Sequence, residues 1–169
     1  MSRTIVHTGR KIRVAIDEEQ APDGQIVRRD VVLHPGAVVI LPVLADGRVC
    51  LLRNNRPAVG EVLWEVPAGT LEPDEPIETA AARELAEETG YRAARWHKLG
   101  EFFPSPGVLS EKMHLFIAED LTPGPLKLEP CEQIEPHLIT RAQALAWALD
   151  GTIRDAKTIL ALLLWEKGR

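Results

Sequence analysis

Runs of apolar residues separated by turns predict a series of β-strands in the first third of the chain. Residues 11–16 alternate polar and apolar side chains, and residues 25–33 are rich in β-branched residues. The Ala-Pro-Asp-Gly turn at residues 21–24 predicts that these two strands form a hairpin. Residues 36–41 are almost continuously apolar, which predicts a strand buried on both faces. An Asp-Gly turn then predicts a second core strand at residues 49–52.

The pattern changes to that of a helix in the middle of the chain. Residues 77–89 are rich in alanine and glutamate, and they lie between Pro76, which suits a first helical turn, and Gly90, which suits a C-terminal cap. The other predicted elements are a polar loop, three strands, a proline-rich loop and two amphipathic helices, at residues 53–60, 62–66, 96–103, 112–118, 121–136, 142–149 and 156–166. This order predicts a mixed α/β (α+β) fold in which helices flank a sheet.

Length, charge and composition narrow the class of protein. The 169 residues are enough for one domain, here residues 35–169, preceded by a β extension at residues 1–34. A net charge of -5 without a basic block argues against nucleic-acid binding, and the most apolar stretch, residues 159–165, is too short to cross a membrane. Cys50 and Cys131 belong to no metal-binding motif and are expected to be reduced thiols. We therefore expect a cytoplasmic protein.

Three glutamates on the central helix are the strongest candidates for chemistry. Glu84, Glu87 and Glu88 are spaced i, i+3 and i+4, so they share one helix face. Such a face is often only solvated surface, and Arg83 could offset part of the repulsion. Three carboxylates beside the backbone carbonyls of residues 67–69 would also suit a hard divalent cation such as Mg²⁺. That ion polarises phosphoryl oxygens and activates water.

The spacing around this helix resembles the Nudix box of the Nudix hydrolases. The resemblance is carried by Gly69, Glu75 and the run Arg-Glu-Leu-Ala-Glu-Glu-Thr-Gly at residues 83–90, whereas Tyr91 stands where the family usually has an aliphatic residue. It implies a mixed sheet sandwiched between helices and hydrolysis of a nucleoside diphosphate linked to another group. It also implies that Glu75 and Arg83 hold the loop and the helix together by an ion pair.

The same resemblance assigns the metal site. It implies that Glu84, Glu87 and Glu88 are metal ligands, directly or through water, that the Ala68 carbonyl is a further ligand, and that Glu87 takes part in catalysis. The expected cofactor is Mg²⁺, with Mn²⁺ or another divalent cation as the alternative.

The flanking sequence resembles the ADP-ribose pyrophosphatase subgroup. Residues 53–60, 64–69 and 105–107 carry this similarity, and Pro106 stands where the subgroup has its characteristic proline after the box. The resemblance implies ADP-ribose as substrate and places Pro106 among the substrate-binding residues. It also implies that the N-terminal β extension helps to form a homodimer.

Further substrate contacts follow from this resemblance. Arg56 is expected to contact the substrate, because a guanidinium pairs well with phosphate, and Glu111 is expected near the metal or the pyrophosphate. Arg29, followed by Asp30, matches an arginine-acid pair that reaches the substrate from the neighbouring subunit. An arginine on a strand can equally face water, so both arginine assignments are hypotheses.

The general base is expected on the acidic segment at residues 128–135. Glu132 aligns best with the acidic run of the family, and Glu129 is the alternative. Competing functions are hydrolysis of GDP-mannose or another nucleotide sugar, non-catalytic nucleotide sensing, and removal of oxidised nucleoside triphosphates. The retained glutamates disfavour sensing, and the N-terminal hairpin with Pro106 disfavours the last function.

Overall fold

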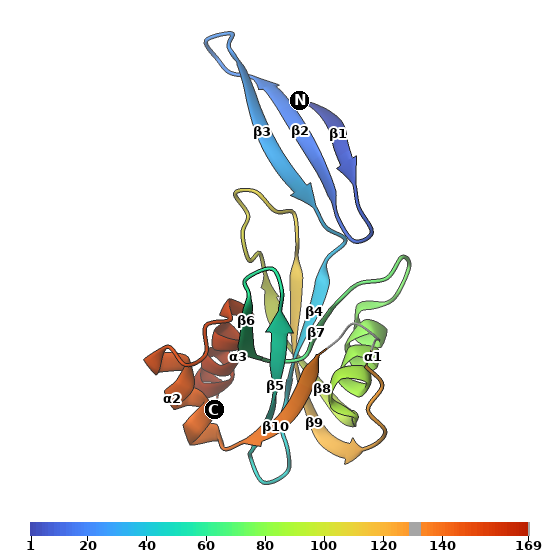
Figure 1. Ribbon diagram of the computed structural model, residues 1–169, viewed down its shortest axis with the longest axis vertical. Helices are drawn as coiled ribbons and strands as arrows, with labels where there is room; N and C mark the ends of the chain where they lie inside the picture. The colour runs from blue at the N-terminus through green and yellow to red at the C-terminus, as the bar shows by residue number, and fades with distance from the viewer. Residues whose placement is uncertain (129–132, 169) are drawn as a thin grey trace.

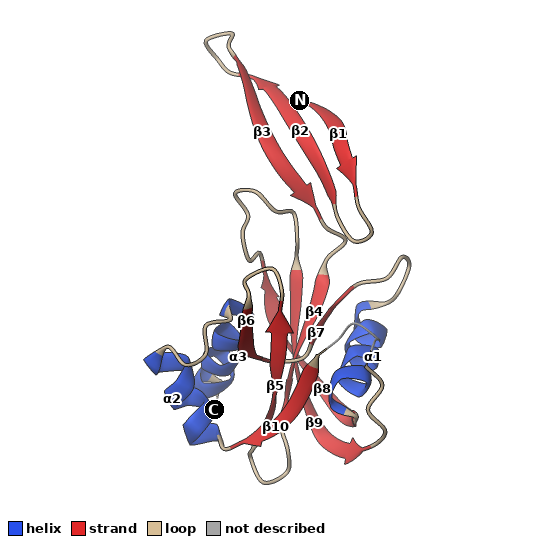
Figure 2. Ribbon diagram, viewed as in Figure 1, coloured by secondary structure: helices blue, strands red, loops and turns tan. Residues whose placement is uncertain are grey.

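The computed structural model describes residues 1–128 and 133–168 of the chain (Figure 1). Its elements, in chain order, are β1 (Ser2–Thr8), β2 (Arg13–Gln20), β3 (Ile26–Leu33), β4 (Ala37–Pro42), β5 (Val49–Arg56), β6 (Glu61–Glu65), β7 (Ala68–Thr70), α1 (Ile77–Thr89), β8 (Tyr91–Phe102), β9 (Met113–Pro123), β10 (Ile134–Ile139), α2 (Arg141–Asp150) and α3 (Ala156–Lys167). The three helices lie where the sequence predicts them. Figure 2 shows α1 on one side of the body and α2 and α3 on the other, with the strands between them.

Two sheets form the middle of the body. The larger has the order β7-β4-β9-β8, in which β4 and β9 are parallel and the other neighbours are antiparallel. The smaller has the order β10-β5-β6 and is antiparallel throughout. The predicted fold, a mixed sheet sandwiched between helices, is therefore confirmed.

Strand β4 is buried along its whole length because each of its two faces packs in a separate hydrophobic core. Val38 and Ile40 pack with Leu85 of α1, whereas Val39 and Leu41 belong to the larger core beneath α2 and α3. A strand covered on both faces has no solvated side, which explains its continuous apolar run. Within the described ranges, no helix is long and apolar enough to cross a membrane.

Helix α1 ends where its sequence predicts. Gly90 has a φ of 71°, a left-handed conformation that glycine adopts without strain, and its N–H donates to the Ala86 carbonyl at 3.0 Å. A Cβ atom at this position would also lie 2.8 Å from the carbonyl oxygen of Gly124. The cap therefore fixes both the end of the helix and the approach of the chain that follows β9.

The N-terminal extension is a sheet of three strands in the order β1-β2-β3. The expected hairpin is present as β2 and β3, while β1 was not predicted, because all of its residues are exposed and show no inward-facing pattern. Figure 1 shows this sheet projecting from the body. Its end is attached to the body by hydrogen bonds from Val32 N–H to the Val108 carbonyl, at 2.7 Å, and from Ser110 N–H to the Val32 carbonyl, at 2.9 Å.

Three further features differ from the sequence prediction. Strand β10 lies partly within the predicted loop, and its Pro136 is tolerated because β10 is an edge strand. Strand β5 continues to Arg56, into residues predicted as a polar loop. The Asp-Gly turn does join β4 to β5, but these strands enter different sheets and are bridged only between Val43 and Val49 in the described chain.

Candidate active site

A cavity of about 1060 Å³ lies between α1, the ends of β4, β5 and β7, and the first turn of α3. Its lining includes most of the residues that the sequence assigns to the site, namely Arg56, Ala68, Glu84, Glu87, Glu88 and Glu111. Glu75 and Arg83 line it as well. The fold therefore brings the acidic helix face and the predicted substrate arginine to one space of a size typical for small-molecule sites.

Arg83 organises the acidic face of α1. Its Nε and Nη2 donate to the two carboxylate oxygens of Glu75, both at 2.9 Å, so the expected ion pair is present. Its Nη1 donates to Glu84 at 2.7 Å and to Glu87 at 3.0 Å. Hydrogen bonds to Glu75, followed by those to Glu84, raise the pKa of Arg83, and the same bond lowers the pKa of Glu75. One guanidinium thus donates hydrogen bonds to three carboxylates.

Glu84 and Glu88 lie at the inner end of this face. They are only 8% and 4% exposed, and the Glu88 carboxylate accepts a hydrogen bond from the Ala68 N–H at 2.9 Å. Gly69 faces Glu84 so closely that a Cβ atom would lie 1.9 Å from its carboxyl carbon. Strand β7 therefore contacts α1 directly, and only glycine leaves room for the Glu84 carboxylate.

The donor set fits a hard divalent cation by its chemistry. Glu75, Glu84 and Glu87 pair with the single charge of Arg83, and Glu88 lines the same cavity, so an excess of negative charge remains. Oxygen donors of this kind are preferred by Mg²⁺ and related ions. In the conformation seen here, no group of three or more acidic, histidine or cysteine side chains among the described residues is arranged to hold a metal ion. Binding would require Arg83 to give up part of its contacts with the carboxylates.

The opposite wall contains a buried ion-pair network that sequence reasoning missed. Arg56 Nε and Nη2 donate to the two oxygens of Glu65 at 2.7 and 2.6 Å, which leaves Nη1 for a ligand in the cavity. Lys157 Nζ donates to Glu65 at 2.6 Å and to Asp155 at 2.9 Å. Burial alone would raise the pKa of Glu65, but the hydrogen bonds and charges of Arg56 and Lys157 outweigh it and lower this pKa.

The first turn of α3 supports this network and the loop beside it. Asp155 caps the helix by accepting from Thr158 N–H at 3.0 Å. The Thr158 hydroxyl donates to Asp155 at 2.5 Å and accepts from the Val66 N–H at 2.8 Å. Val66 directly follows Glu65, so α3 fixes the chain just before Ala68. The sequence gives no signal for these contacts, because Glu65 and Lys157 are 92 residues apart.

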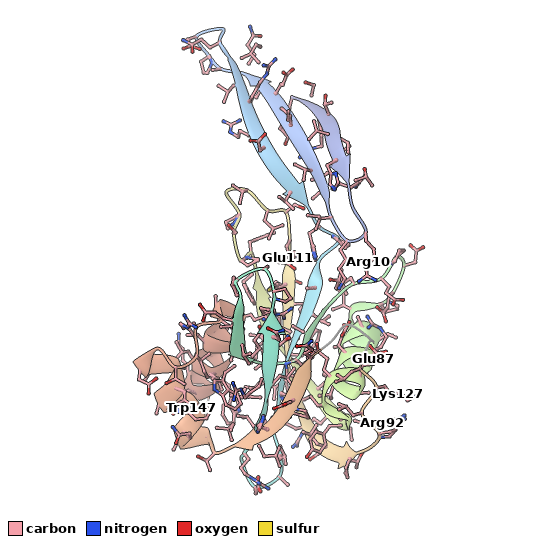
Figure 3. All side chains as sticks on the ribbon, viewed as in Figure 1. Arg10, Glu87, Arg92, Glu111, Lys127 and Trp147 are labelled. Carbon is pink, nitrogen blue, oxygen red and sulfur yellow. The ribbon has the colours of Figure 1, made fainter. Side chains whose placement is uncertain are left out.

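The remaining predicted residues are spread more widely. Glu111 lines the cavity and lies 3.3 Å from His34 Nδ1. In the described chain, Arg29 and Pro106 lie outside the lining, since Arg29 is exposed on β3 and pairs with Glu19 at 2.9 Å, and Pro106 is exposed on the loop between β8 and β9. Figure 3 shows Glu111 and Glu87 on different elements of the body.

The two candidates for the general base, Glu132 and Glu129, lie outside the described residues. Of the described residues beside this segment, Gln133 lines the cavity, whereas Lys127 lies outside its lining. Lys127 N–H donates to the Glu87 carbonyl at 3.2 Å, and Gln133 lines the cavity and bonds through its carbonyl to Asn55 N–H at 3.1 Å.

Comparison with known proteins gives consistent matches. The family model of the NUDIX domain matches residues 33–162. An ADP-ribose pyrophosphatase of Bacillus subtilis (strain 168) is 35% identical over 159 residues, which cover 93% of this chain and 86% of that protein. A GDP-mannose pyrophosphatase of Cronobacter sakazakii (strain ATCC BAA-894) is 37% identical over 155 residues, covering 83% and 79%. A crystal structure of an ADP compounds hydrolase matches with a TM-score of 0.83 at 26% identity, covering 99% of this chain and 93% of that one.

Replacing Gly69 by alanine tests the close approach to Glu84. The added Cβ would displace the Glu84 carboxylate, which is the flexible end of a side chain, so we expect the free energy of unfolding to change by less than about 1 kcal/mol. Divalent-cation binding, measured by calorimetry, should weaken at least about tenfold, because the displaced Glu84 carboxylate would no longer be in position to act as a ligand. Gly107→Ala is the matched control, because no atom of the described residues other than its chain neighbours lies within 4 Å of a Cβ at that position. Unchanged cation binding in Gly69→Ala would contradict the assignment of Glu84.

Replacing Lys157 by methionine tests the buried network. The change leaves Asp155 and Glu65 with one fewer cation in a buried setting, so we expect a loss of about 3 kcal/mol in the free energy of unfolding, measured with urea. Lys167→Met, on the exposed end of the same helix, should change it by less than about 0.5 kcal/mol. Equal stabilities of the two variants would show that the network contributes nothing.

Proposed function

The chain belongs to the NUDIX family, and from this premise we propose that it hydrolyses the pyrophosphate bond of ADP-ribose to give AMP and ribose 5-phosphate. It is a pyrophosphatase of the hydrolase class. One observation carries the choice of reaction, namely that the acidic face of α1 and Arg56 line the same cavity. A diphosphate there would have cation-binding carboxylates on one side and a guanidinium on the other.

We propose Mg²⁺ as the cofactor, with Mn²⁺ or another divalent cation as the alternative. Glu84, Glu87 and Glu88 would hold it, together with the Ala68 carbonyl, and the close contact of Gly69 with Glu84 supports this set. When bound, divalent cations polarise phosphoryl oxygens and lower the pKa of the attacking water. Two of these carboxylates are almost fully buried, which limits competition from solvent water.

Arg56 and Glu111 are proposed to orient the substrate. Arg56 is held by Glu65 through Nε and Nη2, so its remaining Nη1 can donate to a phosphate oxygen with little loss of side-chain freedom. Glu111 lines the same cavity from the chain just before β9 and would act beside the cations or the pyrophosphate. Pro106 and Arg29 do not line the cavity of the described chain, so any contact with substrate would need another subunit.

Glu132 is proposed as the general base, with Glu129 as the alternative. A base must lie within hydrogen-bond reach of the attacking water. The contact of Gln133 with Asn55 supports this proposal, because both residues line the cavity and the chain that follows the segment is therefore held there.

A homodimer is proposed from the N-terminal extension, residues 1–34, which we treat as distinct from the hydrolase domain at residues 35–169. Its exposed apolar side chains include Ile5, Val6 and Ile26. Strand β1 is a sheet edge, and sheet edges favour pairing with another chain. A dimer built through this sheet would allow Arg29 to reach a neighbouring cavity. A cytoplasmic location remains a prediction from the sequence, which has no apolar run of membrane-spanning length and whose two cysteines belong to no disulfide or metal motif.

Hydrolysis of GDP-mannose or another nucleotide sugar is the alternative, favoured by the similarity to GDP-mannose pyrophosphatases.

The substrate can be tested with purified protein, Mg²⁺ and a panel of ADP-ribose, GDP-mannose and nucleoside triphosphates. We expect the highest kcat/KM for ADP-ribose, AMP and ribose 5-phosphate as products, and loss of turnover with a chelator. Slow turnover of ADP-ribose with fast turnover of GDP-mannose would identify GDP-mannose as the substrate instead. No turnover of any diphosphate would favour non-catalytic nucleotide sensing.

Glu88→Gln tests the metal-binding role of α1. Glutamine keeps the shape and can still accept the Ala68 hydrogen bond, but it removes a ligand charge. We expect kcat/KM to fall by about a hundredfold or more, because charge stabilisation by the cation is worth several kcal/mol. Glu78→Gln in the first turn of the same helix is the control and should retain activity. Near-normal turnover and cation affinity in Glu88→Gln would refute the assignment.

A further inference from the structure

The cations of the large cavity differ in whether they are already paired. Arg56, Arg83 and Lys157 are each bound to carboxylates. Arg10 and Lys11 also line this cavity, yet neither forms an ion pair with a carboxylate of the described residues. Like Nη1 of Arg56, they are therefore available to an anionic ligand without breaking an existing ion pair, and they differ from Arg56 in having no carboxylate partner among the described residues.

The local fold presents these two side chains at the end of the N-terminal sheet. Gly9 N–H donates to the Ile12 carbonyl at 2.8 Å, which makes Arg10 and Lys11 the two central residues of the tight turn between β1 and β2. The attachment of Val32 to the body fixes the neighbouring end of β3. Figure 3 shows Arg10 at the end of the sheet that meets the body, on the side of α1.

A second, smaller cavity of about 320 Å³ adjoins this turn and shares Arg10, Lys11 and Pro35 with the large one. Arg13 and His34 also line it, and the described part of its lining contains no aspartate or glutamate. It therefore forms a basic groove beside an acidic cavity. No residue of α1 lines it, so a group bound there would be separate from the cleavage centre.

We propose that Arg10 and Lys11, with the groove behind them, form a binding site for a phosphoryl group other than the cleaved pyrophosphate. The arginine fork and the lysine ammonium suit a phosphate, and the groove is large enough for one. The phosphoryl group is either an additional phosphomonoester on the nucleoside diphosphate substrate or a free phosphate such as a released phosphomonoester. This inference rests on the proposed function for the first source but not for the second.

The test uses the full-length protein with Arg10→Gln and Lys11→Gln combined. The control combines Arg28→Gln and Arg95→Gln, which remove the same charge from exposed side chains paired elsewhere. In the first arm, kcat/KM is compared for ADP-ribose and 2′-phospho-ADP-ribose. If the site binds an additional phosphate of the substrate, the wild type has a higher kcat/KM for the phosphorylated compound. This preference then falls about tenfold in the Arg10/Lys11 variant but not in the control.

In the second arm, binding of inorganic phosphate is measured by calorimetry without a divalent cation and at constant ionic strength. A site for free phosphate predicts that affinity falls about tenfold in the Arg10/Lys11 variant and stays within about twofold in the control. A change in either arm supports the site and identifies its source of phosphate. If neither the substrate preference nor phosphate binding differs between the variant and the control, the proposal is overturned.

The second arm also separates failure of the proposed hydrolase function from failure of the proposed phosphoryl-binding site. If the wild type fails to hydrolyse ADP-ribose, the proposed function is wrong, and phosphate binding still decides whether the groove is an anion site. If ADP-ribose is hydrolysed but both arms show no effect of the Arg10/Lys11 change, only the groove proposal fails.

Discussion

The site depends on the bonds that Arg83 makes with Glu75, Glu84 and Glu87. Without this guanidinium, carboxylates on adjacent turns of α1 would repel one another beside a buried partner, Glu88, in a setting that screens charge poorly. The bonds to Glu75 also tie the loop before α1 to the helix. Arg83 therefore reduces the repulsion within the acidic face, and because it is one cation among three carboxylates, the face remains acidic.

The rest of the fold places this face against a complementary wall. Alternate residues of β4 give α1 an apolar partner on one side and give α2 and α3 a core on the other. The first turn of α3 reaches back through Lys157 and Thr158 to Glu65 and Val66, so it fixes both Arg56 and the loop leading to Ala68. The cavity is thus lined by elements that are far apart in sequence, and α1 and α3 pack against opposite faces of β4.

The parts that the sequence predicts well are those governed by local rules. The bounds of α1 follow from alanine and glutamate content and from Gly90, and the buried strand β4 follows from its apolar run. The acidic face follows from helical periodicity. Local patterns do not predict strands β1 and β10, because β1 is wholly exposed and β10 contains Pro136. The Glu65–Lys157 contact and the position of Arg10 depend on tertiary structure, which no local pattern encodes.

The central claim is that the substrate pyrophosphate binds between the acidic face of α1 and Arg56. A crystal structure with Mg²⁺ and a non-hydrolysable ADP-ribose analogue measures this directly. We predict a cation with carboxylate oxygens of Glu84 and Glu88 at about 2.1 Å, and a phosphate oxygen of the analogue within hydrogen-bond distance of Arg56. An analogue whose diphosphate lies away from α1, or a cation bound without these glutamates, would contradict the account.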